Sequence, residues 1–450
     1  MRRFLVICFV LVVFVVGAFS FYLFPRLQIL NGHAAKTLCS CVFVGGIDEE
    51  RAKKEDIGFF PVTLGSQWVD YEKKEVVADF FGFKPKRARF REGLGCAIYN
   101  ELPVSQESLV LIDVEESYTG VDALQSERAL TAHSDAQIQA VERAMEWAFA
   151  EEDPENPTKI TRATLVFHMG ELVAERYAPG FDSNSRLLGW SMTKTITALL
   201  YGILERQGRL SLDDPAPIPA WEGTDKEGIT IRHLLNMSSG LAWSENYADR
   251  SSVTVMLYES DAMGVMAASA SKEFEPGEAW YYSSGTSNIL AALLSSYFED
   301  QKTYQRFPYE ALFAPLGMKS MCMETDAAGY FVGSSYSWAT ARDWAKLGLL
   351  MLNQGVFEGD TLVNPSWIEF MREPVPASDG LYGGQLWLNA GGKMSATPDD
   401  AFSARGFHGQ RVQVIPSQDL VLVRLGETYF EPNFDFDEWN QRVISALGEL

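Results

Sequence analysis

Basic residues are scarce in this chain of 450 residues, in which 38 lysines and arginines stand against 60 aspartates and glutamates. The formal net charge is −22 at pH 7, and the isoelectric point lies near 4.7. Proteins that bind the phosphate backbone of nucleic acids carry a basic surface. The sequence therefore predicts no nucleic-acid partner. Acidity of this kind indicates a solvated surface and does not identify a substrate.

Histidine is also rare, and the five histidines of the chain form no group with the spacing of metal ligands. They are His33, His133, His168, His233 and His408. Cys39 and Cys41 lie close together, but no histidine partners them, so they do not predict a zinc site. We therefore predict neither a bound metal nor a cofactor.

The five cysteines leave the disulfide pattern open. Cys8 lies in an apolar run, whereas Cys39, Cys41, Cys96 and Cys322 lie beyond it. If the body of the protein is in an oxidising compartment, Cys96 can pair with Cys39 or with Cys41. The four cysteines allow three complete pairings, and free buried thiols are the alternative.

The N-terminus has the pattern of a membrane anchor. Met1-Arg2-Arg3 precedes about 21 uncharged residues from Phe4 to Phe24, enough to cross a hydrocarbon layer of roughly 30 Å. Arginines before this run and acidic residues after it predict that the body is translocated. A cleaved signal peptide with its site at Ala18-Phe19-Ser20 is the alternative. The length of the run favours an uncleaved, single-pass inner-membrane anchor with a periplasmic body.

The length of the chain predicts more than one structural unit. After the anchor of residues 1–24, residues 25–130 are weakly patterned, and we interpret them as an N-terminal extension packed on the body. Residues 131–450 form that body. Because 47% of the residues are hydrophobic and 12% are aromatic, the chain can bury a large core.

Strand patterns lie at the two ends of the body, and helical patterns lie between them. The expected strands form one hairpin at 163–177 and another at 412–425. The expected helices begin after the capping residues Ser134 and Asp135 and continue at 230–237, 287–297, 339–353 and 436–447. This order predicts an α/β (α+β) fold. An antiparallel sheet built from both ends is flanked by terminal helices, and a helical subdomain is inserted.

Ser191-Met192-Thr193-Lys194 is the most informative motif of the chain. Apolar residues from Ile196 to Leu204 predict a helix here, so Lys194 lies one turn after Ser191 on the same face. A serine hydroxyl needs a base within hydrogen-bond reach, and lysine serves as that base when burial lowers its pKa. The helix N-terminus also offers N–H groups to a developing oxyanion. An ordinary amphipathic helix with a capping serine and a solvated lysine is the alternative.

A second S-x-x-K motif shows that spacing alone is weak evidence. Ser269 and Lys272 have the same spacing, but the chain runs on into Pro276, so no helix carries this pair onward. A serine and lysine pair also needs a second proton carrier for the leaving group. Tyr282, in a turn before a predicted helix, supplies a hydroxyl for that role.

Six segments taken together carry a family resemblance. They are Gly189 to Lys194; Gln207 to Leu210 with Asp213-Asp214-Pro215; His233 to Gly240; Tyr282 to Thr286; Phe331 to Ser335 with Ala339 to Trp344; and Arg405 to Gln410. On these segments, and over about residues 134–447, the chain resembles the class C β-lactamase-like serine hydrolases. Within them it is most similar to the 6-aminohexanoate-dimer hydrolase branch. The resemblance implies a β-lactamase/DD-peptidase-like fold.

Carried over residue by residue, the resemblance implies a catalytic group. Ser191 would be the acylated nucleophile, Lys194 its activating partner and Tyr282 the general acid/base. The backbone N–H groups of Ser191 and of Gln410, on an edge strand after Gly409, would form the oxyanion hole.

The resemblance also implies substrate contacts for Tyr247 and for Phe407, His408 and Gly409. Two positions depart from the family pattern. Ser284 replaces the asparagine of the Y-x-N motif, and Phe407 replaces the lysine or histidine that begins the third motif. A phenyl ring cannot pair with the carboxylate of a β-lactam or a peptide. His408 follows, but in a strand its side chain would face the other way.

The sequence thus predicts a membrane-anchored periplasmic serine hydrolase that cleaves esters or small linear amides through an acyl-enzyme on Ser191. The predicted partners are a small ester or amide and, through the N-terminal helix, the membrane. One alternative is a D-alanyl-D-alanine peptidase or β-lactamase. Another is a catalytically inactive binding protein of the cell envelope with the same fold.

Overall fold

The structure is a computed structural model, and it describes residues 4, 17, 24–103, 132–155, 157–429 and 434–448. The predicted span from Phe4 to Phe24 lies almost wholly outside these residues. Within the described ranges, no helix combines the length and the apolar character that crossing a membrane requires.

The body is built on a six-stranded antiparallel sheet, as the sequence predicts. Its strand order is β12-β13-β14-β15-β5-β6. The strands are β12 (Trp387–Leu388), β13 (Phe402–Gly406), β14 (Gln410–Ile415), β15 (Leu420–Gly426), β5 (Thr161–His168) and β6 (Glu171–Tyr177). Both predicted hairpins are present, as β5 with β6 and as β14 with β15. Because β15 pairs with β5, the two ends of the body meet in the middle of the sheet.

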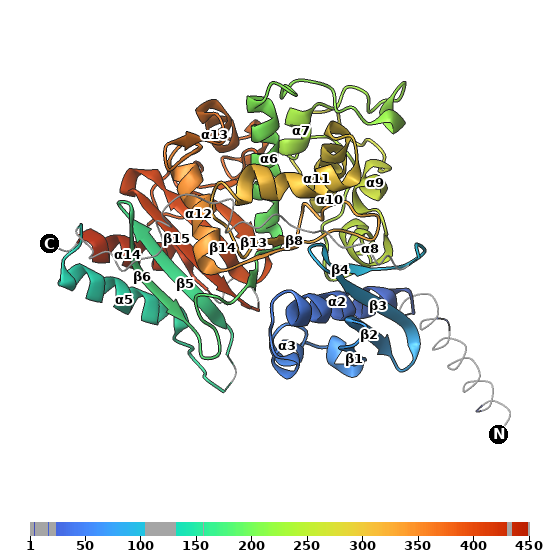
Figure 1. The fold of residues 1–450 in the computed structure, drawn as a ribbon, viewed down its shortest axis with the longest axis horizontal. Coiled ribbons are helices and arrows are strands. Elements are labelled where there is room, and N and C mark those ends of the chain that lie inside the picture. Colours follow the sequence, from blue (N-terminus) through green and yellow to red (C-terminus); the bar gives the residue numbers. More distant parts are fainter. Residues whose placement is uncertain are drawn as a thin grey trace.

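Alternate residues of the central strands are buried on opposite faces of this sheet. Val166 and Leu422 pack with α5 (Asp135–Phe149) and α14 (Phe436–Gly448), whereas Leu165 belongs to the larger cluster that includes α12 (Ala341–Leu352). Figure 1 shows α5 and α14 side by side next to the sheet. The predicted N-terminus of α5 is confirmed, since Ser134 forms a capping box with Gln137.

A helical region stands beside the sheet and contains the predicted subdomain. Its helices are α6 (Thr193–Arg206), α7 (Ile231–Leu235), α8 (Ser252–Glu259), α9 (Met263–Ala268), α10 (Ser284–Leu294), α11 (Gln301–Pro308) and α13 (Pro365–Arg372). A small sheet of order β7-β9-β8 joins β7 (Leu187–Leu188), β9 (Ser337–Ala339) and β8 (Cys322–Met323). Another pair is formed by β10 (Val356–Phe357) and β11 (Asp360–Thr361). Strand β7 leads directly into the segment that carries Ser191.

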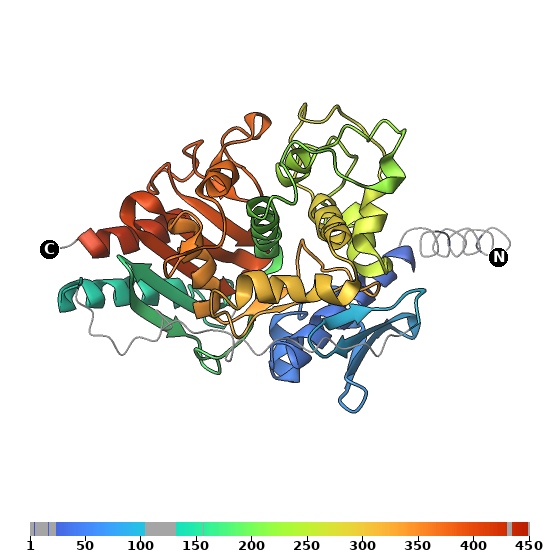
Figure 2. The same cartoon turned by 45° about the horizontal axis from the view of Figure 1, so that its top comes forward.

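Residues 24–103, called the N-terminal unit here, have their own secondary structure. Helices α2 (Phe24–Phe43) and α3 (Glu49–Glu55) precede a four-stranded antiparallel sheet. Its strands are β1 (Ser66–Asp70), β2 (Glu75–Phe80), β3 (Phe83–Arg91) and β4 (Gly95–Ile98). The unit packs below the helical region, and α2 lies between its sheet and α8 (Figures 1 and 2). The sequence pattern predicts no elements here, because β3 contains charged residues at most positions and lacks an apolar alternation.

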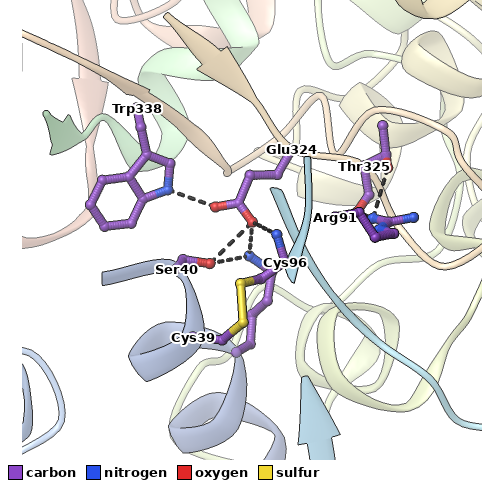
Figure 3. The surroundings of a disulfide bond; sticks show 8 residues. Cys39, Ser40, Arg91, Cys96, Glu324, Thr325 and Trp338 are labelled. Atoms are coloured by element: carbon purple, nitrogen blue, oxygen red, sulfur yellow. Dashed lines mark hydrogen bonds and ion pairs between the residues drawn. A yellow bond between two sulfur atoms is a disulfide. The ribbon is translucent and has the colours of Figure 1, made fainter. Parts of the chain in front are cut away.

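A disulfide joins α2 to β4 within this unit. Cys39 pairs with Cys96, which is one of the two pairings that the sequence left open. Cys41 and Cys322 are free thiols and both are buried. Figure 3 shows that the disulfide lies beside Glu324, whose carboxylate accepts hydrogen bonds from Ser40 and from the Cys96 backbone N–H.

We expect removal of this disulfide to destabilise the protein measurably. The double variant Cys39→Ala/Cys96→Ala should lose about 4 kcal/mol of unfolding free energy in urea, since the bond closes a loop over 57 positions and restricts the unfolded chain. Wild-type protein should show a similar loss in dithiothreitol. Cys322→Ala is the control, because it removes a buried thiol and should remain sensitive to reductant. A wild-type melting temperature that does not respond to reductant would contradict the prediction.

Candidate active site

The structure brings Ser191 and Lys194 into contact. Ser191 lies in a 3-10 turn, Trp190–Met192, immediately before α6, and Lys194 lies in the first turn of that helix. The Lys194 Nζ atom is 3.0 Å from Ser191 Oγ, 3.0 Å from Ser284 Oγ and 2.9 Å from the Ser334 carbonyl oxygen. Three acceptors match the three protons of an ammonium group.

Burial tunes the acid–base chemistry of this lysine. Lys194 is only 2% exposed, and burial lowers its pKa to about 8, with the negative charge of Glu245 opposing part of the shift. A lysine with such a pKa has a useful neutral fraction near pH 7 to 8. The neutral amine can accept the proton of Ser191 as the hydroxyl attacks.

A carboxylate behind the lysine was missed by the sequence reasoning. Glu245 accepts hydrogen bonds from Ser284 N at 3.0 Å, from Tyr247 OH at 2.8 Å and from the indole N–H of Trp243 at 2.6 Å. The Ser284 hydroxyl also donates to Glu245, so it accepts from Lys194. A hydrogen-bonded chain therefore runs from Lys194 through Ser284 to Glu245. The sequence offered one signal for this residue, an acidic side chain two positions before Tyr247.

Tyr282 stands next to the serine and lysine pair. It lies immediately before Ser283, whose side chain caps α10 by accepting a hydrogen bond from Thr286 N. The Lys194 Nζ atom lies 4.9 Å from the centre of the Tyr282 ring, and this ring also packs on that of Trp387 at 5.3 Å between centroids. The turn before α10 thus holds the predicted second proton carrier beside the lysine.

The rings of Trp190, Phe407 and Tyr247 pack together next to the segment that carries Ser191, and we call them the aromatic wall. The Phe407 ring stacks on that of Tyr247 at 5.7 Å and meets that of Trp190 edge-on at 5.8 Å. Phe407 is 45% exposed and Tyr247 is 40% exposed, so both present apolar surface to solvent. The hydroxyl of Tyr247 points inward to Glu245 and Ser284, and burial together with Glu245 raises its pKa above the ordinary value.

Two details of the predicted oxyanion strand need correction. Residues Phe407–Gly409 form a 3-10 turn rather than a strand, because His408 adopts a left-handed backbone with φ of 58°. Strand β14 begins at Gln410 and pairs with both β13 and β15, so it is not an edge strand. The Gln410 side chain accepts from Gly426 N at 3.0 Å, which fixes the start of β14 against the end of β15.

Close packing holds the 407–409 turn next to the nucleophile segment. A Cβ atom on Gly406 would lie 2.1 Å from the Gly189 carbonyl oxygen, so only glycine allows this approach. Arg424, fully buried, donates to the carbonyl oxygens of His408 at 3.1 Å and Gly409 at 3.0 Å. These contacts fix the backbone from which the predicted oxyanion donor of Gln410 projects.

His408 is held by the protein through one ring nitrogen. Its Nδ1 atom is 2.6 Å from Glu427 Oε2. One face of the imidazole stacks on the Phe407 ring at 3.9 Å. Within the described ranges, no three His, Cys, Asp or Glu side chains are grouped so that they could hold a metal ion.

Comparisons with known proteins concern the family and the fold of the chain. The model of the beta-lactamase family matches residues 155–447. The 6-aminohexanoate-dimer hydrolase of Paenarthrobacter ureafaciens is 24% identical over 315 residues, which cover 62% of this chain and 75% of the relative.

Solved structures show the same fold. A putative 6-aminohexanoate-dimer hydrolase from Bacillus anthracis superimposes with a TM-score of 0.53 at 21% identity, over 64% of this chain and 78% of that protein. EstCE1, described as a hydrolase with promiscuous acyltransferase activity, gives a TM-score of 0.55 at 16% identity, over 69% and 98%. At these identities the likeness concerns the fold.

The pKa of Lys194 predicts the pH dependence of acylation. The neutral amine is the active form, so kcat/KM for a p-nitrophenyl ester should rise about tenfold per pH unit on the acid side and level off above a pKa of about 8. In Glu245→Gln the charge that raises the Lys194 pKa is gone, so the midpoint should move to lower pH.

Glu278→Gln is the matched control for this pH profile, because Glu278 is exposed and accepts a hydrogen bond from the nearby Glu275 backbone N–H. Its midpoint should equal that of the wild type. A profile that falls as pH rises through 8, or a Glu245→Gln midpoint above that of the wild type, would contradict the assigned acid–base state of Lys194.

Proposed function

Because the chain belongs to the beta-lactamase family, we propose that it is a serine hydrolase that cleaves esters or small linear amides through an acyl-enzyme on Ser191. The contact between Lys194 Nζ and Ser191 Oγ at 3.0 Å carries this proposal, since burial lowers the pKa of the lysine into the range of a working base.

The proposed reaction uses each of these groups in turn. Ser191 Oγ attacks the substrate carbonyl carbon while neutral Lys194 takes the hydroxyl proton. The backbone N–H groups of Ser191 and Gln410 stabilise the oxyanion. A proton passes by way of Lys194 and Tyr282 to the leaving alcohol or amine as its bond to carbon breaks. Water then attacks the acyl-enzyme, gives its proton to the same pair and releases the acid with free Ser191.

The aromatic wall beside Ser191 supports an ester or linear amide substrate. Phe407 offers no cation to a carboxylate, whereas its ring and that of Tyr247 present a stacked apolar surface. The names of two relatives support the same substrate class, since one is a 6-aminohexanoate-dimer hydrolase and the other a hydrolase with promiscuous acyltransferase activity. The peptidase or β-lactamase alternative requires recognition of a carboxylate, which Phe407 disfavours.

We also propose that the chain is anchored in the inner membrane with its body in the periplasm. The uncharged run from Phe4 to Phe24 supports this location. The Cys39–Cys96 disulfide suits an oxidising compartment. Phe81, at the β2–β3 turn, is 73% exposed, and Lys84 lies 4.8 Å from the Phe24 ring at the end of the run. Aromatic and basic side chains are typical of the membrane interface.

A serine-directed probe tests the nucleophile. A fluorophosphonate should label the wild-type protein covalently, and Ser191→Ala should abolish labelling because the attacking oxygen is lost. Lys194→Ala should lower the labelling rate by about 100-fold or more, since general-base assistance contributes on that scale. Ser269→Ala, in the second S-x-x-K motif, is the control and should label normally. Retained labelling of Ser191→Ala would refute the assignment.

Substrate screening separates the enzyme classes. We expect turnover of p-nitrophenyl esters or linear amide dimers that exceeds turnover of nitrocefin. Faster nitrocefin hydrolysis, or covalent capture of penicillin, would support the peptidase or β-lactamase alternative. Failure of every acyl donor to form an adduct detectable by mass spectrometry would support a binding protein that lacks catalysis.

Membrane extraction tests the location. The full chain should remain with inner membranes after a carbonate wash, and its body should be degraded by protease added to spheroplasts. The mass of the purified protein should include the residues from Met1 to Phe24. A soluble periplasmic product that begins just after Ser20 would instead establish a cleaved signal peptide.

A further inference from the structure

Each predicted oxyanion donor follows a bulky residue with a left-handed backbone by one or two positions. Trp190 precedes Ser191 and has φ of 46°, and His408 lies two positions before Gln410 and has φ of 58°. Residues with a Cβ atom rarely adopt this conformation, and it persists only where surrounding contacts determine it. The contacts of Trp190 and His408 therefore set the geometry of the oxyanion hole.

The contacts of His408 lead to the N-terminal unit. Its Nδ1 atom pairs with Glu427 at 2.6 Å, and Glu427 pairs with Arg162 on β5 at 3.3 Å. Arg162 binds both carboxylate oxygens of Asp56, at 3.0 Å and 2.7 Å. Asp56 directly follows α3 of the N-terminal unit, and the side chains of Arg162, Asp56 and Glu427 are at most 6% exposed.

The contacts of Trp190 lead to the same unit by a second route. The Trp190 ring packs on that of Tyr336 at 5.7 Å, and Lys36 Nζ of α2 lies 3.7 Å from the centre of the Tyr336 ring. Lys36 forms a buried ion pair with Glu324 at 2.5 Å. Glu324 also accepts from the Trp338 indole at 2.7 Å, as Figure 3 shows, and Trp338 lies on the strand that pairs with β7.

We infer that the N-terminal unit is a positioning module for the oxyanion hole. Asp56, through Arg162 and Glu427, fixes the turn that leads to the Gln410 N–H. Lys36, through Tyr336, fixes Trp190 beside the Ser191 N–H. Both are positioning residues, because they act through other side chains. The inference rests on the proposed hydrolase function, and it assigns a role to a unit that lies outside the matched residues 155–447.

The buried ion pairs at this interface favour a role in fixing geometry over a role in merely holding the N-terminal unit on the body. A buried ion pair adds little net stability compared with apolar side chains of the same volume, because desolvation offsets the attraction. A bidentate guanidinium and carboxylate pair fixes distance and orientation together. An interface that only had to hold the unit in place would be served as well by packed apolar residues. The two buried pairs instead lie on the two paths to the oxyanion donors.

Asp56→Asn tests the first path in the full chain. The amide keeps the shape of the carboxylate but removes its charge, so Arg162 loses its bidentate carboxylate and keeps only the contact with Glu55 at 2.9 Å on the side of the N-terminal unit. We expect kcat for a p-nitrophenyl ester to fall about 10-fold to 100-fold, since loss of one oxyanion donor costs up to about 1,000-fold. KM should change less than kcat, because an oxyanion donor strengthens its contact in the transition state and adds little to binding of the ground state. The rate of fluorophosphonate labelling should fall in parallel with kcat.

Asp261→Asn is the matched control. Asp261 also joins the body to the N-terminal unit, by accepting from the backbone N–H groups of Asn100 and Leu102 at 2.8 Å each, but it lies on neither path. This variant should lose a comparable amount of thermal stability while its kcat stays within about twofold of the wild type. An equal loss of kcat in both variants would mean that the unit acts only through general stability, which would overturn the inference.

The double variant Lys36→Met/Glu324→Gln tests the second path. It removes both charges of the buried pair, so it remains a usable test even if Asp56→Asn fails to fold. The amide oxygen introduced at position 324 can still accept from the Cys96 N–H and the Ser40 hydroxyl, which share Oε2, while the Trp338 indole, which donates to Oε1, loses its acceptor. We expect kcat to fall about 10-fold with little change in KM. Values of kcat within about twofold of the wild type in both path variants would overturn the inference. Absence of labelling in the wild type would instead refute the proposed function.

Discussion

Burial of the Lys194 amine is the constraint on which the rest of the site depends. A buried ammonium group is costly unless acceptors replace its water, and here the acceptors are Ser191, Ser284 and Ser334. They come from three separate segments: the turn before α6, the start of α10 and the loop before β9. The helical region and the loop that leads into the small sheet must therefore both pack around the lysine. The same burial lowers its pKa to about 8, so one packing arrangement gives both the geometry and the basicity.

The parts of the fold that the sequence predicts are those in which each element carries its own signal. Strand β5 alternates between two buried faces, and α5 opens with a capping box, so both are evident locally. The turn at 407–409 has no such signal. The strand expected here came from the family resemblance, and His408 is held in its left-handed conformation by contacts with Glu427 and Arg424, which lie 19 and 16 positions away. Hence a strand was predicted where the structure has a turn.

The N-terminal unit shows the same limit at longer range. Lys36 and Glu324 are 288 positions apart, and Asp56 and Arg162 are 106 apart. In the sequence each of these residues has the pattern of a solvated charge. Only the folded chain pairs them and buries them. Cysteine chemistry restricts the partner of Cys96 to two candidates, Cys39 and Cys41, whereas no such restriction applies to lysine, arginine and the carboxylates.

The two departures from the family pattern lie at Ser284 and Phe407, and they leave the contact between Ser191 and Lys194 intact. An asparagine at position 284 could donate to a substrate, whereas the Ser284 hydroxyl already donates to Glu245 and accepts from Lys194. The lysine keeps its hydrogen bond, but a donor facing the substrate is lost. Phe407 stands where the family pattern has a lysine or histidine, so a cation is absent there as well, and its ring stacks on that of Tyr247. Under the proposed function, selection of the acyl group then depends on shape and aromatic contact rather than on charge. Neutral esters and amides meet that condition without leaving a buried carboxylate unpaired.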